Sequence, residues 1–597
     1  MYTIKDLDIS INDNVLTVHL GEIEKKIPWE NKDLKSRFYI YECPSDHIDY
    51  ERVVIEEGKT LFKANSKRGI YITKRLKSVF HLKQRQLFTF FTEKNLVYVG
   101  IWSNLKDVYD DVDNVYLNDK TIGKVIRPFR FWKLKSIGVI KIPNDKIIAE
   151  NRIHSRVGIG DSQGNNIQLK PGWKYIRKRI LAKKRFDDLI VIVHSIKGKR
   201  KISITKLPYS AEYSSICTLK NYAALMVALL SKPFSKLINI VLLYEKKTGK
   251  ASESGWYIFK KIMEMPDRKA TPYFIIDKES PDFQAAYDQY PDNVIPKYSF
   301  RHFLYIYLCR YFISSELSNH VMNPRLIMPG LNRAICRKPL VFLQHGIMFS
   351  KPIENPNAQG FRKDNPGINI YKSVISSELE ATEFYKVGFE RSDLIKSGLP
   401  KFDISKRNPN SNKIVLMLTY RFWEEAIMQD KSRIHETTYY QTYMQLIEAF
   451  KDHNLLDRLI ISCHPIFADC ILKGAPEYRN LVTEDVNKAL EECAIYITDY
   501  SSASYDAHYR GSYVIYYWAD RDYLIENYKA EPPINETNCD GVPVFSIDEL
   551  MQEIKRADQN HYIMDSFHEE NYKKINEFHD NKNGDRLIKA LQELDII

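Results

Sequence analysis

Polar and titratable residues follow four short apolar segments in the second half of this 597-residue chain. They are QHG (344–346) after PLVFL, LTYR (418–421) after KIVLM, HP (464–465) after RLIISC and TDYSS (498–502) after AIYI. In open α/β sheets, ligands bind beyond the carboxyl ends of the strands. We therefore expect these four segments to meet at one binding site.

Two of the segments contain a histidine, His345 and His464. A lone histidine is more often structural than catalytic, but two imidazoles at one cleft can divide the work of proton transfer. One can accept a proton near neutral pH while the other donates a proton or holds charge. Gly346 permits a tight turn beside a ligand, and Pro465 ends its strand directly after the histidine.

The other two segments are suited to binding anions. Arg421 has a planar guanidinium that matches phosphate oxygens. The segment after Asp499 has the pattern of a helix start with Ser501 or Ser502 at the cap, and the free N–H groups of such a start suit a diphosphate. Simple capping is the alternative role for both serines. Neither a Walker A motif nor GxGxxG occurs in the sequence, which argues against an ATPase or a dinucleotide-dependent oxidoreductase.

These segments belong to an alternating pattern of strands and helices. A strand, helix and strand follow one another over residues 238–277, and the alternation restarts at residue 412. Such alternation predicts a parallel sheet with helices against it. We therefore predict an α/β fold with two Rossmann-like lobes that face a cleft, at residues 237–375 and 376–597.

The first part of the chain has a different pattern. Residues 1–170 contain short segments of alternating apolar and polar residues separated by Asn, Asp and Gly, which predicts an added N-terminal all-β domain. Eight cysteines are scattered without a CxxC pair, so the sequence predicts neither a disulfide framework nor a zinc site. No metal or cofactor is expected.

A basic segment separates these two parts. Residues 151–250 carry 21 Lys or Arg against 5 Asp or Glu, and we expect residues 171–236 to be a basic linker. Within it, residues 219–237 form an apolar, helix-favouring stretch flanked by lysines that could lie in a membrane interface. A buried linker helix is the alternative. The flanking lysines are Lys220, Lys232 and Lys236.

The start of the chain lacks the features of a secretory signal, and no apolar run reaches the roughly 20 residues that cross a bilayer. The expected location is therefore the cytoplasm, with a peripheral place on the membrane if the apolar helix binds lipid.

The order of the motifs resembles that of a known family. QHG, SGLPKFD (397–403), LTYR, CHP and TDYSS, followed by YVIYYWADRDY, resemble the CDP-glycerol and CDP-ribitol polyolphosphotransferases of teichoic acid and capsule synthesis. The resemblance extends over about residues 236–597. It implies a GT-B fold, a CDP-polyol donor and a lipid-linked polyol-phosphate acceptor at the cytoplasmic face of a bacterial membrane. The terminal hydroxyl of the growing polymer would attack the phosphorus that bears the polyol and expel CMP.

For this reaction we hypothesise roles for individual residues. His345 would be the general base, and His464, Arg421 and the start of the helix at Ser501 and Ser502 would hold the diphosphate and stabilise charge on the leaving CMP. Asp499 would orient the donor ribose or anchor its own loop. The remaining residues expected to bind substrate are Gly346, Lys351, Lys401, Thr419 and Pro465.

The chain departs from the family pattern beside the first histidine. Many members have WHGT followed closely by a lysine, whereas this chain has QHGIMFSK, with Gln344, Ile347 and Lys351 at the differing places. This departure affects the prediction of which acceptor is used more than the prediction of which type of reaction is catalysed. Neither the choice between glycerol and ribitol nor the choice between teichoic acid and capsule follows from these motifs.

Three other functions remain open from the sequence. The His-Pro and Ser-Ser elements also resemble those of capsule polysialyltransferases, which use CMP-sialic acid. A non-catalytic scaffold could bind an anionic glycopolymer through the basic segment. A nucleic-acid binder would use the same charge with tyrosines, but no nucleic-acid-binding motif accompanies it, and nucleic acid is not an expected partner.

Overall fold

The computed structural model describes the chain from Lys201 onward except for residues 323–328, 356–360, 366, 425–426, 428–430, 464–467 and 469–474; before Lys201 it describes Asp188 and the strands given below. His464 and Pro465, which the sequence places at the site, lie outside the described residues. The chain divides into two compact units, Met1–Tyr213 with Ile327–Pro329 and Ser214–Leu326 with Gly330–Ile597.

The described elements of the first unit are mainly strands, and each strand pairs antiparallel with its neighbours. They are β1 (Leu7–Asn12), β2 (Val15–Leu20), β3 (Ile23–Pro28), β4 (Phe38–Glu42), β5 (Ile48–Glu57), β6 (Thr60–Ala64), β7 (Ile70–Thr73), β8 (Leu87–Glu93), β9 (Leu96–Ser103), β10 (Asn114–Leu117), β11 (Lys120–Lys124), β12 (Arg130–Phe131), β13 (Leu134–Pro143), β14 (Ser155–Gly160), β15 (Asn166–Gln168), β16 (Ile180–Phe186), β17 (Leu189–Ile196) and β18 (Lys201–Pro208).

The expected linker at 171–236 is not what the structure contains. Strands β16, β17 and β18 form an antiparallel meander that joins the sheet of β14. The meander has a core of its own, since Ile190, Val191 and Ile204 are buried. The density of Lys and Arg obscured a period-two apolar pattern that is typical of strands.

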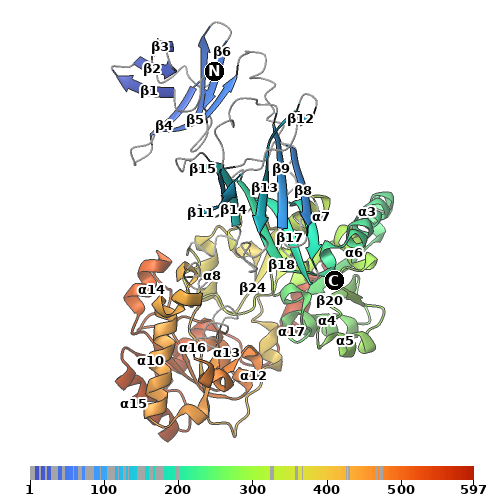
Figure 1. The fold of residues 1–597 in the computed structure, drawn as a ribbon. Helices are drawn as coiled ribbons and strands as arrows, with labels where there is room; N and C mark the ends of the chain where they lie inside the picture. Colours follow the sequence, from blue (N-terminus) through green and yellow to red (C-terminus); the bar gives the residue numbers. More distant parts are fainter. Residues whose placement is uncertain are drawn as a thin grey trace. The chain divides into compact units, whose positions relative to one another are not determined.

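The second unit contains two sheets in which every described pairing is parallel. The first sheet has the order β21, β20, β19, β22, β23, β24, β25 and the second has the order β28, β27, β26, β29, β30, β31. This arrangement confirms the predicted α/β fold, a GT-B-like pair of Rossmann-type lobes (Figure 1). The strands are β19 (Ile240–Tyr244), β20 (Thr271–Ile276), β21 (Val294–Pro296), β22 (Tyr311–Ser314), β23 (Leu340–Phe342), β24 (Ile370–Ile375), β25 (Leu394–Lys396), β26 (Lys413–Leu416), β27 (Leu459–Ser462), β28 (Val482–Thr483), β29 (Cys493–Thr498), β30 (Tyr513–Tyr517) and β31 (Val542–Val544).

Helices flank these sheets, and none formed by the described residues combines the length and the apolar character needed to cross a bilayer. They are α3 (Ser215–Leu230), α4 (Ser254–Glu264), α5 (Phe283–Gln289), α6 (Phe300–Leu308), α7 (Pro329–Arg337), α8 (Glu378–Lys386), α10 (Thr438–Asp452), α12 (Val486–Glu491), α13 (Ala503–Tyr509), α14 (Arg521–Tyr528), α15 (Ile547–Gln559), α16 (Ser566–Ile575) and α17 (Asn583–Glu593).

The boundary between the lobes differs from the predicted one at residue 375. Strand β25 still pairs with β24 in the first sheet, and the second sheet begins only at β26, so the connection lies between residues 397 and 412. The chain later returns to the first lobe through α17, which lies beside α4 in Figure 1. The Lys261 Nζ and Asp585 Oδ1 atoms are 2.6 Å apart across this contact.

Candidate functional site

The first predicted catalytic residue lies in a sharp turn at the end of a buried strand. Strand β23 is fully buried in the middle of the first sheet, and the turn that follows it places the His345 side chain in contact with solvent. Gln344 precedes the histidine with φ of 58°, in the left-handed region that residues with side chains rarely occupy. The turn therefore presents His345 at the carboxyl edge of the sheet, as predicted.

Segments from the two lobes meet beside this turn. A Cβ atom added to Gly346 would lie 2.8 Å from the Ser502 Oγ of the second lobe, so only a glycine allows this approach without a shift. Lys401, in the connection between the lobes, donates from Nζ to the His345 carbonyl oxygen at 3.0 Å and to Asp506 Oδ2 at 2.7 Å. Three of the predicted motifs, QHG, SGLPKFD and TDYSS, are thus in one place.

His345 is neutral at physiological pH in this environment. The His345 side chain reaches solvent, but desolvation by the surrounding protein and the charges of three lysines lower its pKa to about 4. A hydrogen bond with the Ser315 backbone acts in the opposite direction and raises the pKa. The lysines are Lys401, Lys246 and Lys351. A neutral imidazole has a free lone pair, so His345 can accept a proton.

Asp499 ties the ends of two strands together. Its Oδ1 accepts hydrogen bonds from the backbone N–H groups of Thr419 at 2.7 Å and Tyr500 at 2.6 Å. Its Oδ2 is buried and has no hydrogen-bond partner among the described residues. Desolvation lowers the pKa of Lys351, and the charge of Asp499 opposes that shift. Asp499 therefore anchors its own loop with one oxygen, whereas the other oxygen remains available.

The two serines of the TDYSS segment have different roles. The Ser501 Oγ accepts a long hydrogen bond of 3.4 Å from the N–H of Ala503, and Ser501 is buried. Ser502 is the N-cap residue of α13, but its hydroxyl makes no capping hydrogen bond. The Ser502 hydroxyl instead lies next to Gly346, where the lobes meet. Capping thus accounts for Ser501 better than for Ser502.

Arg421 lies in the protein interior. Its side chain is 1% exposed, and its Nη2 is 3.0 Å from Asp520 Oδ2. The other terminal nitrogen bonds the Thr438 hydroxyl, and the guanidinium lies 5.7 Å from the centre of the Tyr523 ring. Both terminal nitrogens of the guanidinium are therefore bound to neighbouring side chains of the second lobe, whereas its Nε has no hydrogen-bond partner among the described residues.

Two residues that the sequence analysis missed hold the site in place. Asp506 binds Lys401, and its Oδ1 is also 2.7 Å from Arg510 Nε. Glu380 accepts hydrogen bonds from the turn that carries His345. The spacing of Asp506 and Arg510, four residues apart on a helix, was a usable signal for an ion pair. Nothing in the sequence distinguishes Glu380 from other helical glutamates.

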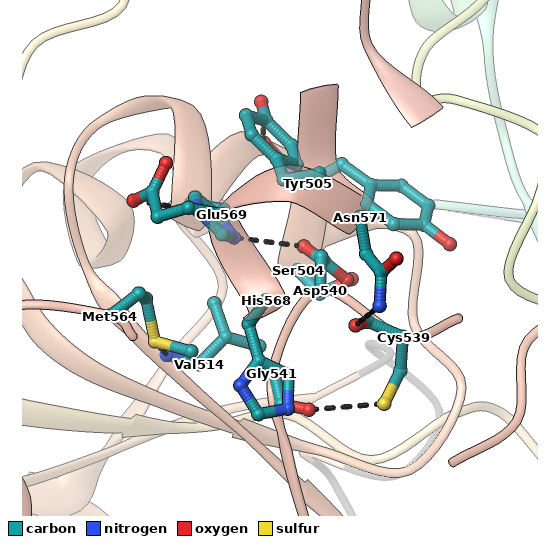
Figure 2. A network of polar contacts seen from close by, with 12 residues as sticks. Ser504, Tyr505, Val514, Cys539, Asp540, Gly541, Met564, His568, Glu569 and Asn571 are labelled. Carbon is teal, nitrogen blue, oxygen red and sulfur yellow. Dashed lines mark hydrogen bonds and ion pairs between the residues drawn. The ribbon is translucent and has the colours of Figure 1, made fainter. Parts of the chain in front are cut away.

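A polar network includes His508 of helix α13, and Figure 2 shows several of its other members, including Asp540, Glu569 and Ser504. His508 Nδ1 lies 3.1 Å from Asp540 Oδ2, and its Nε2 lies 3.3 Å from Glu569 Oε1. Burial alone would lower the pKa of His508, but the two carboxylates raise it from 6.5 to about 9. Because the pKa is raised by folding, this contribution to stability is complete below pH 6.5 and is lost as the pH rises through 9. At neutral pH the charged imidazole of His508 on α13 forms an ion pair with Glu569 on α16.

The chain is similar to proteins of teichoic acid synthesis. It matches the model of the CDP-glycerol:poly(glycerophosphate) glycerophosphotransferase family over residues 226–593. A curated relative, the minor teichoic acid biosynthesis protein GgaB of Bacillus subtilis (strain 168), is 22% identical over 398 residues, which are 63% of this chain and 43% of that protein. The chain thus spans less than half the length of this relative.

Two solved structures also resemble the chain. The wall teichoic acid polymerase TagF is 13% identical with a TM-score of 0.40, and the match covers 64% of this chain and 98% of TagF. A UDP-GlcNAc 2-epimerase from Methanocaldococcus jannaschii is 13% identical with a TM-score of 0.35, over 60% of this chain and all of the epimerase.

The paired parallel sheets, with polar turns of both lobes in contact, define a two-lobed α/β protein of the GT-B type. The family match covers more than half of the residues. The chain belongs to the CDP-glycerol:poly(glycerophosphate) glycerophosphotransferase family.

Proposed function

We propose that this protein transfers a polyol phosphate from a CDP-polyol to the hydroxyl end of a growing teichoic acid or capsular polymer and releases CMP. The family match makes CDP-glycerol the first donor to test, with CDP-ribitol second. The observation that carries the proposal is the contact between lobes at Gly346 and Ser502, beside His345 and Lys401. A neutral base and several cationic groups lie together there, which suits attack by a hydroxyl on a diphosphate.

In the proposed reaction, a hydroxyl oxygen of the acceptor forms a bond to the phosphorus that bears the polyol. The bond from that phosphorus to the CMP oxygen breaks, and the hydroxyl proton passes to His345. A diphosphate near Lys401 and Lys351 would offset their charges, which lower the pKa of His345, and would so raise its basicity when the donor binds. Positioning and charge stabilisation of this kind supply most of the catalysis in phosphoryl transfer.

The remaining groups are proposed to bind the donor. The Ser502 hydroxyl and Lys351 would contact the diphosphate, together with His464 and Arg421. The buried Asp499 Oδ2, which has no hydrogen-bond partner among the described residues, would accept a hydrogen bond from the donor. The Arg421 Nη2 already pairs with Asp520, which a bound diphosphate would compete with. No metal is assigned a role in this scheme.

The test is release of CMP from three donors offered separately with a polymer acceptor. We expect CMP from CDP-glycerol or CDP-ribitol, together with a longer polymer, and none from CMP-sialic acid. CMP release from CMP-sialic acid alone would make the protein a capsule glycosyltransferase. No release from any donor, with retained binding to the polymer, would favour the scaffold.

We also propose that helix α3 docks the enzyme on the anionic membrane surface where a lipid-linked acceptor would reside. The buried residues of α3 are only Cys217, Asn221 and Ala224 among those described. Large apolar side chains of α3 and the turn after it are exposed instead, including Leu219 at 69% and Leu230 at 74%. This exposure favours an interfacial helix over the buried linker helix. The other exposed apolar residues of α3 and the turn after it are Ile216, Tyr222, Met226, Val227, Leu229, Phe234 and Leu237.

Replacing Lys220, Lys232 and Lys236 together by Glu should release the protein from anionic vesicles, because each lysine near the surface contributes about 1 kcal/mol of attraction. Co-sedimentation with vesicles of phosphatidylglycerol measures the effect. The control variant replaces three exposed lysines outside α3 by Glu and so changes the net charge by the same amount; it should still bind the vesicles. These lysines are Lys269, Lys451 and Lys589, whose side chains are 67%, 55% and 79% exposed. Equal loss in both variants would refute a specific docking helix.

A further inference from the structure

The turn from Gln344 to Met348 has a backbone that needs external support. Gln344 has φ of 58°, and a residue with a side chain keeps this conformation only when its surroundings enforce it. The Gln344 side chain is fully buried and reaches away from the site, where its Nε2 donates to the Val374 carbonyl oxygen. Ile347 is also fully buried. His345 is thus the exposed residue of a turn whose neighbours are fixed in the interior.

One carboxylate holds both ends of this turn. Glu380 Oε1 accepts a hydrogen bond from Gln344 Nε2 at 3.0 Å and another from the Met348 N–H at 2.7 Å. The second oxygen, Oε2, accepts from the Ser376 N–H at 2.6 Å. The carboxylate therefore links residues on either side of His345 to the end of strand β24.

Glu380 is itself held firmly. It lies in the first turn of α8, where a negative charge is favourable, and its N–H is capped by the Ser377 Oγ at 3.0 Å. The side chain is fully buried, and burial raises its pKa to about 7 despite the three hydrogen bonds. A carboxylate that is buried beside a candidate site and hydrogen-bonded to the turn of that site is a candidate for positioning it.

We infer that Glu380 is the positioning residue for His345: it fixes the 344–348 turn so that the imidazole faces the diphosphate site. The inference rests on the proposed role of His345 as the base. It assigns to Gln344, which departs from the family pattern, the task of connecting the turn to Glu380. Neither residue is expected to contact substrate.

The test compares Glu380→Gln with Glu383→Gln in the full chain. Glutamine has the size of glutamate, but one of its two ends is a donor and would oppose the N–H of Ser376 or the donors of the turn. Glu383 is the matched control, since it is 2% exposed, lies one turn along α8 and pairs with Lys386 at 2.7 Å instead of with the turn.

We expect Glu380→Gln to lower kcat by about 10- to 100-fold, as misplacement of a reacting group does, with KM for CDP-glycerol changed by less than about 3-fold. Amide hydrogen exchange across 344–348 should accelerate by about 10-fold or more. Glu383→Gln should change neither quantity. Unchanged kcat and exchange in Glu380→Gln, or equal effects in both variants, would overturn the inference.

Gln344→Ala removes the other partner of the hydrogen bond between Gln344 and Glu380. This variant replaces the first one if Glu380→Gln does not fold. It should also lower kcat with little change in KM, and the double variant should be no slower than Glu380→Gln alone, because both act through one turn. If the losses in kcat of the two single variants multiplied in the double variant, the two residues would act independently and the inference would be refuted. If the parent protein releases no CMP from any donor, the proposed function is refuted. Amide hydrogen exchange does not depend on turnover, so it would still test whether Glu380 holds the 344–348 turn in place.

Discussion

Replacing His345 by alanine is expected to lower polyol phosphate transfer by about 10²-fold or more, as removal of a general base or charge-stabilising group does. The residue is suited to the role because it is exposed at the meeting of the lobes and has a pKa of about 4, so it is unprotonated when the donor binds. The measurement is the rate of CMP release with saturating CDP-polyol and acceptor. The midpoint of thermal unfolding should stay close to that of the parent, since an exposed side chain contributes little packing.

His435→Ala is the matched control, because it removes another exposed histidine of the second unit and should leave the rate unchanged. A His345→Ala variant with near-normal turnover would exclude His345 from the mechanism. The same loss is expected of His464→Ala, whose assignment rests on its sequence motif alone.

Gly398→Ala is expected to lower the free energy of unfolding by about 3 kcal/mol. Gly398 has φ of 75°, where an added side chain costs roughly 1–2 kcal/mol. Its Cβ would also lie 2.8 Å from the Asn583 Cγ, and overpacking of this kind costs about 1–3 kcal/mol. Asn583 cannot easily retreat, because it is fully buried and its Oδ1 accepts from Arg586 at 2.6 Å.

Denaturant unfolding measures this loss, and Gly511→Ala separates its two causes. Gly511 has φ of 83° but no atom within 4 Å of an added Cβ, so its replacement should cost only the roughly 1–2 kcal/mol of backbone strain. Equal losses at the two positions would show that the contact with Asn583 contributes nothing. The comparison therefore measures how firmly α17 is held against the connection between the lobes.

The parts of the fold that could be predicted from the sequence depend on local patterns. Alternating apolar strands and helices are visible over 238–277 and again from 412, and both lobes follow from them. The positions of His345 and Ser502 follow from the rule that ligands bind at the carboxyl ends of parallel strands. The contact between Gly346, next to His345, and Ser502 then follows from the arrangement of the two sheets.

What could not be predicted depends on partners that are distant in the sequence. Lys401 was expected to reach phosphate, yet its ammonium is held between Asp506 and the His345 carbonyl oxygen. Arg421 was expected to face the ligand, yet its side chain is buried and pairs with Asp520, 99 residues later. Local spacing carries no information on such pairs. The strands at 180–208 could not be predicted for another reason, since the many Lys and Arg residues there obscure the alternation of apolar residues.

The return of α17 to the first lobe affects how the protein folds. Leu587 and Leu591 belong to the same hydrophobic cluster as Ile258 and Phe259 of α4, and the ion pair beside them joins residues 324 positions apart. Contacts of such high contact order form only after a very long loop has closed, which slows folding. The first lobe is therefore completed only by the C-terminal helix, and a fragment ending between the lobes would leave an apolar face of α4 unprotected and prone to aggregate.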